Sequence, residues 1–229
     1  MTKLKIIPIL AGVGHVYLVI AEKGFLLVDT GTKGYENKIL KAVTSRGLNI
    51  EALQIIFLTH THYDHAGCAA FLKEKSGAKI IVHESEADKL RDGFHRVPDG
   101  TNPLFSVISF MGKRVSKLYN KFQPVAPDII FDDELELSPF GIEGKIIHTP
   151  GHTSGSSSLI IENNAFVGDS LFNIMHKIYP PFANDETALL ESWKKLLKQD
   201  ADWYYPAHGK RLRQKQIRKE FEKRNRNKV

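Results

Sequence analysis

The sequence predicts an α/β fold in which two mostly antiparallel or mixed β-sheets pack face to face with helices outside. Two observations support this fold class. Runs of β-branched and aliphatic residues, separated by glycine-containing turns, recur in both halves of the chain. Each half reads as a strand meander, then a helix, then a further strand, and the 42% of hydrophobic residues is typical of a globular core.

The first half contains three predicted helices between short apolar strands. Strands are predicted at residues 6–9, 16–20, 24–29, 55–58 and 79–82. Helices are predicted at 35–46, 66–75 and 84–91. In the first helix Ile39, Leu40 and Val43 have helical spacing, and Gly47 is the expected C-cap.

The stretch 93–127 differs from the rest in composition. It combines four prolines with apolar aromatic residues and Met111: Pro98, Pro103, Pro124, Pro127, Phe94, Phe105, Phe110, Tyr119 and Phe122. It is too long for an ordinary connection in a compact domain. We therefore expect an irregular insertion that forms either a flap over a pocket or a contact in a homodimer, and the sequence does not separate the two.

The second half again favours strands, with one long helix near its end. The strands are predicted at 129–131, 134–137, 144–149, 157–161, 165–168 and 203–205. The amphipathic helix is predicted at 186–197. Residues 1–209 are thus interpreted as one domain, followed by a basic terminal helix or tail at 210–229.

Positive charge is concentrated in this tail. The whole chain carries a formal charge of +6, whereas residues 210–229 hold ten Lys/Arg against two Glu, a net +8, which leaves −2 for the rest. A basic tail can bind nucleic acid or anionic lipid. A solvated terminal helix that aids solubility is the interpretation we favour.

Cys68 is the only cysteine, so an intrachain disulfide is excluded and a reducing compartment is indicated. No apolar run approaches the roughly 18 residues that a membrane span needs, and no signal-peptide cleavage site follows the N-terminus. We expect a cytoplasmic protein with no membrane partner, in which Cys68 is a small buried hydrophobic residue on the helix after residue 65.

The stretch Thr59-His60-Thr61-His62-Tyr63-Asp64-His65 is the most informative part of the sequence. In an extended segment, side chains at i and i+2 point the same way, so His60 and His62 can bind one ion. If a helix starts next, Asp64 and His65 lie in its first turn and can face a second ion. Imidazole and carboxylate ligands suit zinc, iron or manganese.

Three later motifs each place a ligand-type residue just after an apolar strand. They are Pro150-Gly151-His152-Thr153, Val167-Gly168-Asp169 and Pro206-Ala207-His208-Gly209. The Asp169 carboxylate is able to bridge two ions. Together with the first motif they supply seven ligands, enough for two ions with positions open for water.

These four motifs, in this order, resemble the metallo-β-lactamase superfamily over about residues 6–209. The resemblance implies an αββα sandwich with two divalent metal ions, zinc above all, at one edge of the sheets. By motif, His60, His62 and His152 would hold the first ion, Asp64, His65 and His208 the second, and Asp169 would bridge. It also implies that Asp29 orients a ligand histidine through a hydrogen bond.

The other histidines carry weaker expectations. We expect His83 and His148, at strand ends, to be structural, and assign no role to His15. His95 and His176 lie in segments that could border the pocket, but neither is predicted to act.

The resemblance implies a hydrolase in which a hydroxide shared by two ions attacks a small-molecule substrate, with Asp64 orienting the nucleophile or moving a proton. True β-lactamases of the family typically lack a bridging Asp, so Asp169 argues against β-lactams. Many acyl-homoserine lactonases have tyrosine where Phe172 stands, which argues against that activity. The aromatic insertion and the nearly neutral domain favour a small, partly apolar ester, thioester or lactone.

Two other classes stay open. A mononuclear iron oxidoreductase similar to the persulfide dioxygenases would not need the full set Asp64, His65 and His208. A phosphodiesterase or nucleic-acid processor would use the +8 tail, and its binding would depend on salt.

Overall fold

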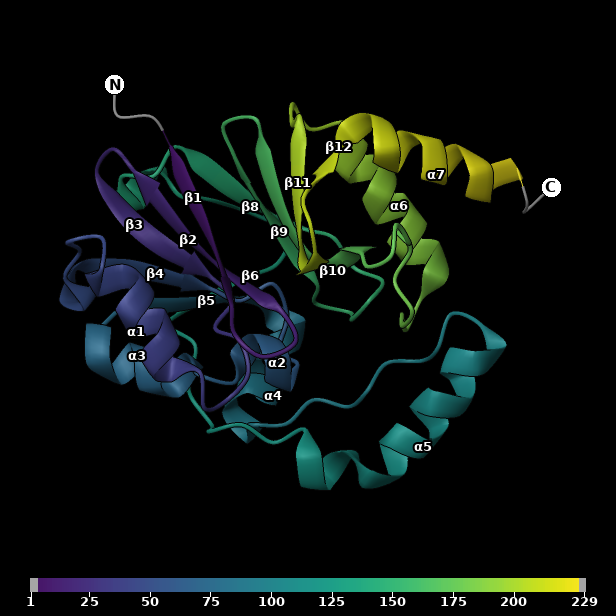
Figure 1. The fold of residues 1–229 in the computed structure, drawn as a ribbon, viewed down its shortest axis with the longest axis horizontal. Helices are drawn as coiled ribbons and strands as arrows, with labels where there is room; N and C mark the ends of the chain where they lie inside the picture. The colour runs from purple at the N-terminus through teal and green to yellow at the C-terminus, as the bar shows by residue number, and fades with distance from the viewer. Residues whose placement is uncertain (1–3, 227–229) are drawn as a thin grey trace.

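The computed structural model describes residues 4–226 and builds them into two six-stranded sheets with helices on the outside (Figure 1). The first sheet has the order β1 (Lys5–Leu10), β2 (His15–Ala21), β3 (Gly24–Val28), β4 (Leu53–Phe57), β5 (Lys79–His83) and β6 (Ile129–Phe131). Strands β1 to β3 form an antiparallel meander, and β3 to β6 run parallel. The predicted α/β sandwich is confirmed.

The second sheet has the order β12 (Leu212–Arg213), β11 (Trp203–Gly209), β10 (Asn164–Asn173), β9 (Ser157–Ile161), β8 (Gly144–His148) and β7 (Glu134–Glu136). All its pairs are antiparallel except β10 with β11. Two predicted strands were too short: β10 continues to Asn173 and β11 to Gly209, so Asp169 and His208 lie within strands. Register shifts on both sides of Gly168 interrupt the hydrogen-bonded ladder of β10, where the polar side chains begin.

Alternation along the strands explains why the sheets pack as they do. Val19, Leu26 and Ile55 of the first sheet face the second sheet, and they share one buried cluster with its Leu159 and Phe166. The alternate residues point to the opposite face, where helices cover them. This pattern gives three hydrophobic layers, one between the sheets and one outside each sheet.

The helices on the side of the first sheet are α1 (Glu36–Thr44), α2 (Tyr63–Ala66), α3 (Ala69–Ser76) and α4 (Glu84–Asp92). Two 3-10 turns complete the elements: η1 (Ile50–Ala52) precedes β4, and η2 (Ser138–Phe140) connects β7 with β8. The helix predicted at 66–75 is α3, which begins three residues later than expected, at Ala69, and Gly67 and Cys68 separate it from the short α2. The Gly67 N–H donates to the Gly31 carbonyl at 2.8 Å, and a Cβ there would lie 2.4 Å from the Lys33 nitrogen. The predicted Gly47 cap is wrong, since α1 ends at Thr44 and Ser45 is its cap.

The second sheet is covered by α6 (Glu186–Leu197) and α7 (Gln214–Arg226). Asp185 caps α6 by accepting hydrogen bonds from the backbone N–H groups of Thr187 and Ala188. The expected basic terminal helix is present as α7, but it is less solvated than expected, because Ile217 is buried in the outer layer of this sheet. Residues 227–229 of the predicted tail lie outside the described residues. Between residues 4 and 226, no helix combines the length and the apolar character needed to cross a bilayer.

The composition of the stretch 93–127 predicted an irregular insertion, and the structure contradicts this prediction. The stretch contains the 17-residue helix α5 (Pro103–Tyr119), which lies at the edge of the molecule (Figure 1). The prolines flank this helix, and Pro103 occupies its first turn, where a missing N–H costs nothing. The inner side of α5 is attached through Ser109, whose hydroxyl donates to the Pro98 carbonyl at 2.6 Å, and through Phe105, which packs edge-on against Phe182.

Candidate metal centre

The first motif lies where β4 ends, between the two sheets. His60 and His62 follow outside regular secondary structure, with His62 in extended backbone, and Asp64 and His65 lie in the single turn of α2, as the sequence predicted. His60, His62 and His65 are buried, with at most 7% of their surface exposed. The motif therefore turns its polar side chains inward at one edge of the sandwich.

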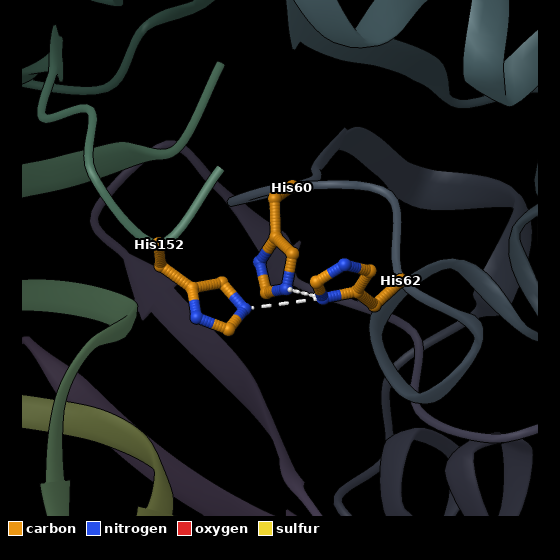
Figure 2. A group of neighbouring side chains, drawn as sticks. All are labelled: His60, His62 and His152. Atoms are coloured by element: carbon orange, nitrogen blue, oxygen red, sulfur yellow. Dashed lines mark hydrogen bonds between the residues drawn. The ribbon is translucent and has the colours of Figure 1, made fainter. Parts of the chain in front are cut away.

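Three histidines converge in the first ligand group, as Figure 2 shows. The Nδ1 atom of His62 lies 2.8 Å from Nε2 of His60 and 3.1 Å from Nε2 of His152. These nitrogens come from two loops, one after β4 and one between β8 and β9. Their convergence is the arrangement that a single cation with imidazole ligands requires.

Backbone carbonyls fix which nitrogen of two rings faces the centre. His62 donates through Nε2 to the Arg96 carbonyl at 3.1 Å, and His152 donates through Nδ1 to the Phe182 carbonyl at 2.9 Å. In this assignment the remaining nitrogen of each ring carries a lone pair toward the group. Burial, aided by the neighbouring histidines, lowers the pKa of both His60 and His62 well below the ordinary value, so these rings are neutral ligands at neutral pH.

The second group consists of Asp64, His65 and His208. Oδ2 of Asp64 lies 3.4 Å from Nε2 of His208 and 3.9 Å from Nε2 of His65. His208, on β11, donates through Nδ1 to the Val13 carbonyl at 3.0 Å, so its Nε2 faces the carboxylates. Burial alone would lower the pKa of His208, but the Asp169 and Asp64 carboxylates outweigh it and raise the pKa to about 10.

Asp169 lies between the two groups. Its Oδ1 is 3.4 Å from Nε2 of His65 and 3.3 Å from Nε2 of His208, whereas its Oδ2 is 3.4 Å from Nε2 of His152. One carboxylate thus directs one oxygen to each group. Asp169 lies in the part of β10 where register shifts interrupt the backbone ladder with β11, and Gly168, at φ +50°, allows the backbone to approach Thr59 closely.

Two buried atoms at this centre test whether a cation fits. Among the described side chains, Nε2 of His65 and Oδ1 of Asp169 are buried without a hydrogen-bond partner. Leaving such atoms unsatisfied is costly, and a metal ion between them would satisfy both. The His/Asp cluster is therefore able to bind metal ions.

Asp29 lies behind His65, where the resemblance expects an orienting carboxylate. Its Oδ2 accepts the Nδ1–H of His65 at 2.9 Å, and its Oδ1 accepts the backbone N–H of Thr59 at 2.8 Å. Asp29 has φ +62°, a left-handed conformation that Asp tolerates better than most residues and that directs the carboxylate inward. The bond to Nδ1 leaves Nε2 of His65 to face Asp64 and Asp169.

A cavity of about 270 Å³ opens over the cluster. Beside the ligand residues, its wall is largely apolar and includes Val97, Pro98, Phe172, Pro181 and Phe182, with Asn120 as a polar member. Val97, Pro98 and Asn120 belong to the segment that the sequence interpreted as a flap or dimer contact, so part of that segment borders the pocket. The Phe172 ring stacks on His208 at 4.8 Å between centroids.

Sequence reasoning missed Glu86 next to the first group, and it assigned no role to His95, which it placed in a segment that could border the pocket. The ring centroid of His95 lies 4.3 Å from that of His62, and Glu86 is fully buried behind both. Of the other histidines, His83 and His148 stack on each other, with centroids 3.8 Å apart, and His176 lies beside α7, whereas Nδ1 of His15 lies 3.1 Å from the carbonyl oxygen of Ala207, the residue before His208. Position 86 falls on the buried face of an amphipathic helix. An ionisable residue on such a face was the one sequence feature that could have indicated a functional role for Glu86.

Comparison with known proteins agrees with this geometry. The sequence profile of the metallo-beta-lactamase superfamily matches residues 9–208. The chain belongs to this superfamily. A probable metallo-hydrolase of Methanocaldococcus jannaschii is 29% identical over 197 residues, which cover 84% of this chain and 86% of the relative.

Further members of the superfamily are similar over shorter stretches or in fold alone. The hydroxyacylglutathione hydrolase GloC of Haemophilus influenzae is 30% identical over 154 residues, 66% of this chain and 63% of the relative. The crystal structure of a metallo-beta-lactamase family protein from Thermus thermophilus superposes with a TM-score of 0.71 at 21% identity, covering 99% of this chain and 79% of the other. The two hydrolase relatives support a metallo-hydrolase, and the solved structure supports the fold.

Proposed function

We propose that this metallo-hydrolase holds two divalent ions and hydrolyses a small, partly apolar ester, thioester or lactone. The position of Asp169 carries the proposal, because its two oxygens face two different groups of ligands. In this assignment His60, His62 and His152 would hold one ion, Asp64, His65 and His208 would hold the other, and Asp169 would contribute to both. Zinc is the proposed metal, and iron and manganese accept the same ligands.

Two ions at such a site supply Lewis acidity and lower the pKa of water to near neutrality. The residues of the chain would position the attacking water and the substrate. Asp64 borders the cavity and is partly accessible, so its carboxylate is placed to orient an attacking water or to accept its proton. The apolar wall, with Val97, Phe172 and Phe182, would exclude water and hold the acyl part of the substrate.

The thioester within this substrate class has support from a relative, since GloC is named a hydroxyacylglutathione hydrolase. The alternative, a mononuclear iron oxidoreductase, is less favoured because Asp64, His65 and His208 form a complete second group. A homodimer, nucleic-acid binding through the basic tail and a cytoplasmic location stay predictions.

The experiment is a hydrolysis panel on the metal-loaded protein, with uncharged thioester, lactone and ester reporters beside a phosphodiester. We expect turnover of a carbonyl substrate that chelation abolishes and added metal restores. The matched variant is Asp64→Asn, and the exposed Asp88→Asn is its control. Preference for the phosphodiester would overturn the proposed substrate class, and full activity of Asp64→Asn with both ions bound would overturn the role of Asp64.

A further inference from the structure

Glu86 is a buried carboxylate outside the ligand set. It lies on α4 and is fully buried. Burial alone would raise its pKa, but His95, Lys89 and Thr61 outweigh that effect and hold the pKa well below the ordinary value. Glu86 is therefore an anion in the interior, and such a group is stable only where hydrogen bonds and cations surround it.

The donors to Glu86 come from both loops that carry the first ligand group. Thr61, between His60 and His62, donates its backbone N–H at 3.0 Å and its hydroxyl in a further, short bond. Thr153, directly after His152, donates its hydroxyl at 2.9 Å. One carboxylate thus ties together two loops that lie about 90 residues apart in the sequence.

A lysine, a histidine and close packing hold the carboxylate itself in place. Nζ of Lys89 lies 3.1 Å from Oε1, and Nδ1 of His95 lies 3.2 Å from Oε2. Gly155 leaves room for the side chain, since a Cβ there would lie 2.6 Å from Cγ of Glu86. Because His95 also packs against His62, the network contacts each element of the first group from behind.

The second group has its own supports. Asp29 orients His65, and the Val13 carbonyl orients His208. None of the hydrogen bonds described for Glu86 reaches Asp64, His65 or His208. Asp29 thus contacts the second group directly and the first group only through the Thr59 hydroxyl, which lies 3.2 Å from Nδ1 of His60, whereas the contacts of Glu86 all lie on the side of the first group.

We propose that Glu86 is a positioning residue that sets the spacing of His60, His62 and His152 and thereby the affinity of the first metal subsite. The inference rests on the proposed function, because it presumes an ion at that subsite. Loss of the negative charge would let the loops at Thr61 and Thr153 move apart while the second subsite kept its geometry. Residues that orient ligands in this way typically change metal affinity about 10–100-fold.

The test compares Glu86→Gln with Glu84→Gln, an exposed glutamate in the first turn of the same helix. Zinc affinities are measured by competition with a chromophoric chelator, and ¹¹³Cd NMR separates the two subsites; the resonance lost in His152→Ala marks the first. We expect Glu86→Gln to bind one ion about 10–100-fold more weakly and to weaken or lose that resonance. Glu84→Gln should match wild type.

Circular dichroism of each apoprotein establishes that the variant is folded, and Glu86→Asp provides a second variant if Glu86→Gln is not. If a folded Glu86→Gln variant bound zinc at both subsites with wild-type affinity, the role of Glu86 would be overturned and the proposed function would stand. A loss confined to the other resonance would also overturn that role. If wild type itself bound fewer than two ions, the proposed function would fail instead, so the two failures are distinguishable.

Discussion

Replacing Asp29 by Asn removes one charge at the second group with little change of shape. Asn tolerates the left-handed backbone of this position, φ +62°, about as well as Asp does. The Asp29 carboxylate accepts bonds from Nδ1–H of His65 and from the N–H and hydroxyl of Thr59. An amide offers one oxygen and one donor group, so one of these buried donors loses its acceptor.

The energetic cost of Asp29→Asn follows from this number of lost hydrogen bonds. An unsatisfied buried donor costs about 1–3 kcal/mol of folding free energy. If the lost bond is that of His65, its imidazole is less well oriented, and metal affinity at the second group falls about 10–100-fold, equivalent to about 1.4–2.7 kcal/mol. We expect Asp29→Asn to keep the ion at His60, His62 and His152 and to bind the other ion more weakly.

The assay is chelator competition on the apoprotein, accompanied by urea unfolding. Asp88→Asn is the control, because its side chain is 92% exposed on α4. If a folded Asp29→Asn variant bound both ions as tightly as wild type, the orienting role of Asp29 would be refuted. Weakening of both ions to the same extent would likewise contradict the separation of the two supports.

Three further predictions concern buried side chains. Burial raises the pKa of Cys68 to about 12, so the native thiol should not react with a disulfide reagent at pH 8 and should react once urea unfolds the chain; equal rates in both states would contradict this. The fully buried Trp193 donates to the Ser170 carbonyl at 2.6 Å, so Trp193→Ala should lower the free energy of unfolding by about 3–5 kcal/mol, measured with urea. The pKa of Glu86 is lower in the folded state than in the unfolded chain. The Glu86 carboxylate therefore stabilises the fold at pH values above the ordinary glutamate pKa, and this stabilisation is lost as the pH falls below that pKa. Apo Glu86→Gln should therefore lose stability less steeply than wild type between about pH 6 and pH 3, and parallel curves would argue against a charged Glu86.

Much of the fold was predictable because strand alternation and turn chemistry are local. The seven candidate ligands were also predictable, since their four motifs come at or near the ends of apolar runs, and such positions gather at one sheet edge, although Asp169 and His208 lie within longer strands than expected. The structure brings all seven together, with Asp29 behind His65.

What the sequence did not reveal depends on tertiary contacts. Helix α5 was missed because flanking prolines look like loop punctuation, although Pro103 starts the helix. Strand β10 was ended too early because its ladder is interrupted near Gly168. Glu86 was missed because no local pattern reveals that Thr61 and Thr153 will meet on one carboxylate.

The central claim is that Asp169 joins two complete ligand groups, and the most direct test is metal content per chain. Elemental analysis of protein purified without added metal, then of the same protein after loading with zinc and gel filtration, measures it. The account predicts two ions per chain after loading, and fewer in Asp169→Ala. A single iron per chain that zinc loading does not increase, with oxygen consumption on persulfides and no hydrolysis, would contradict it.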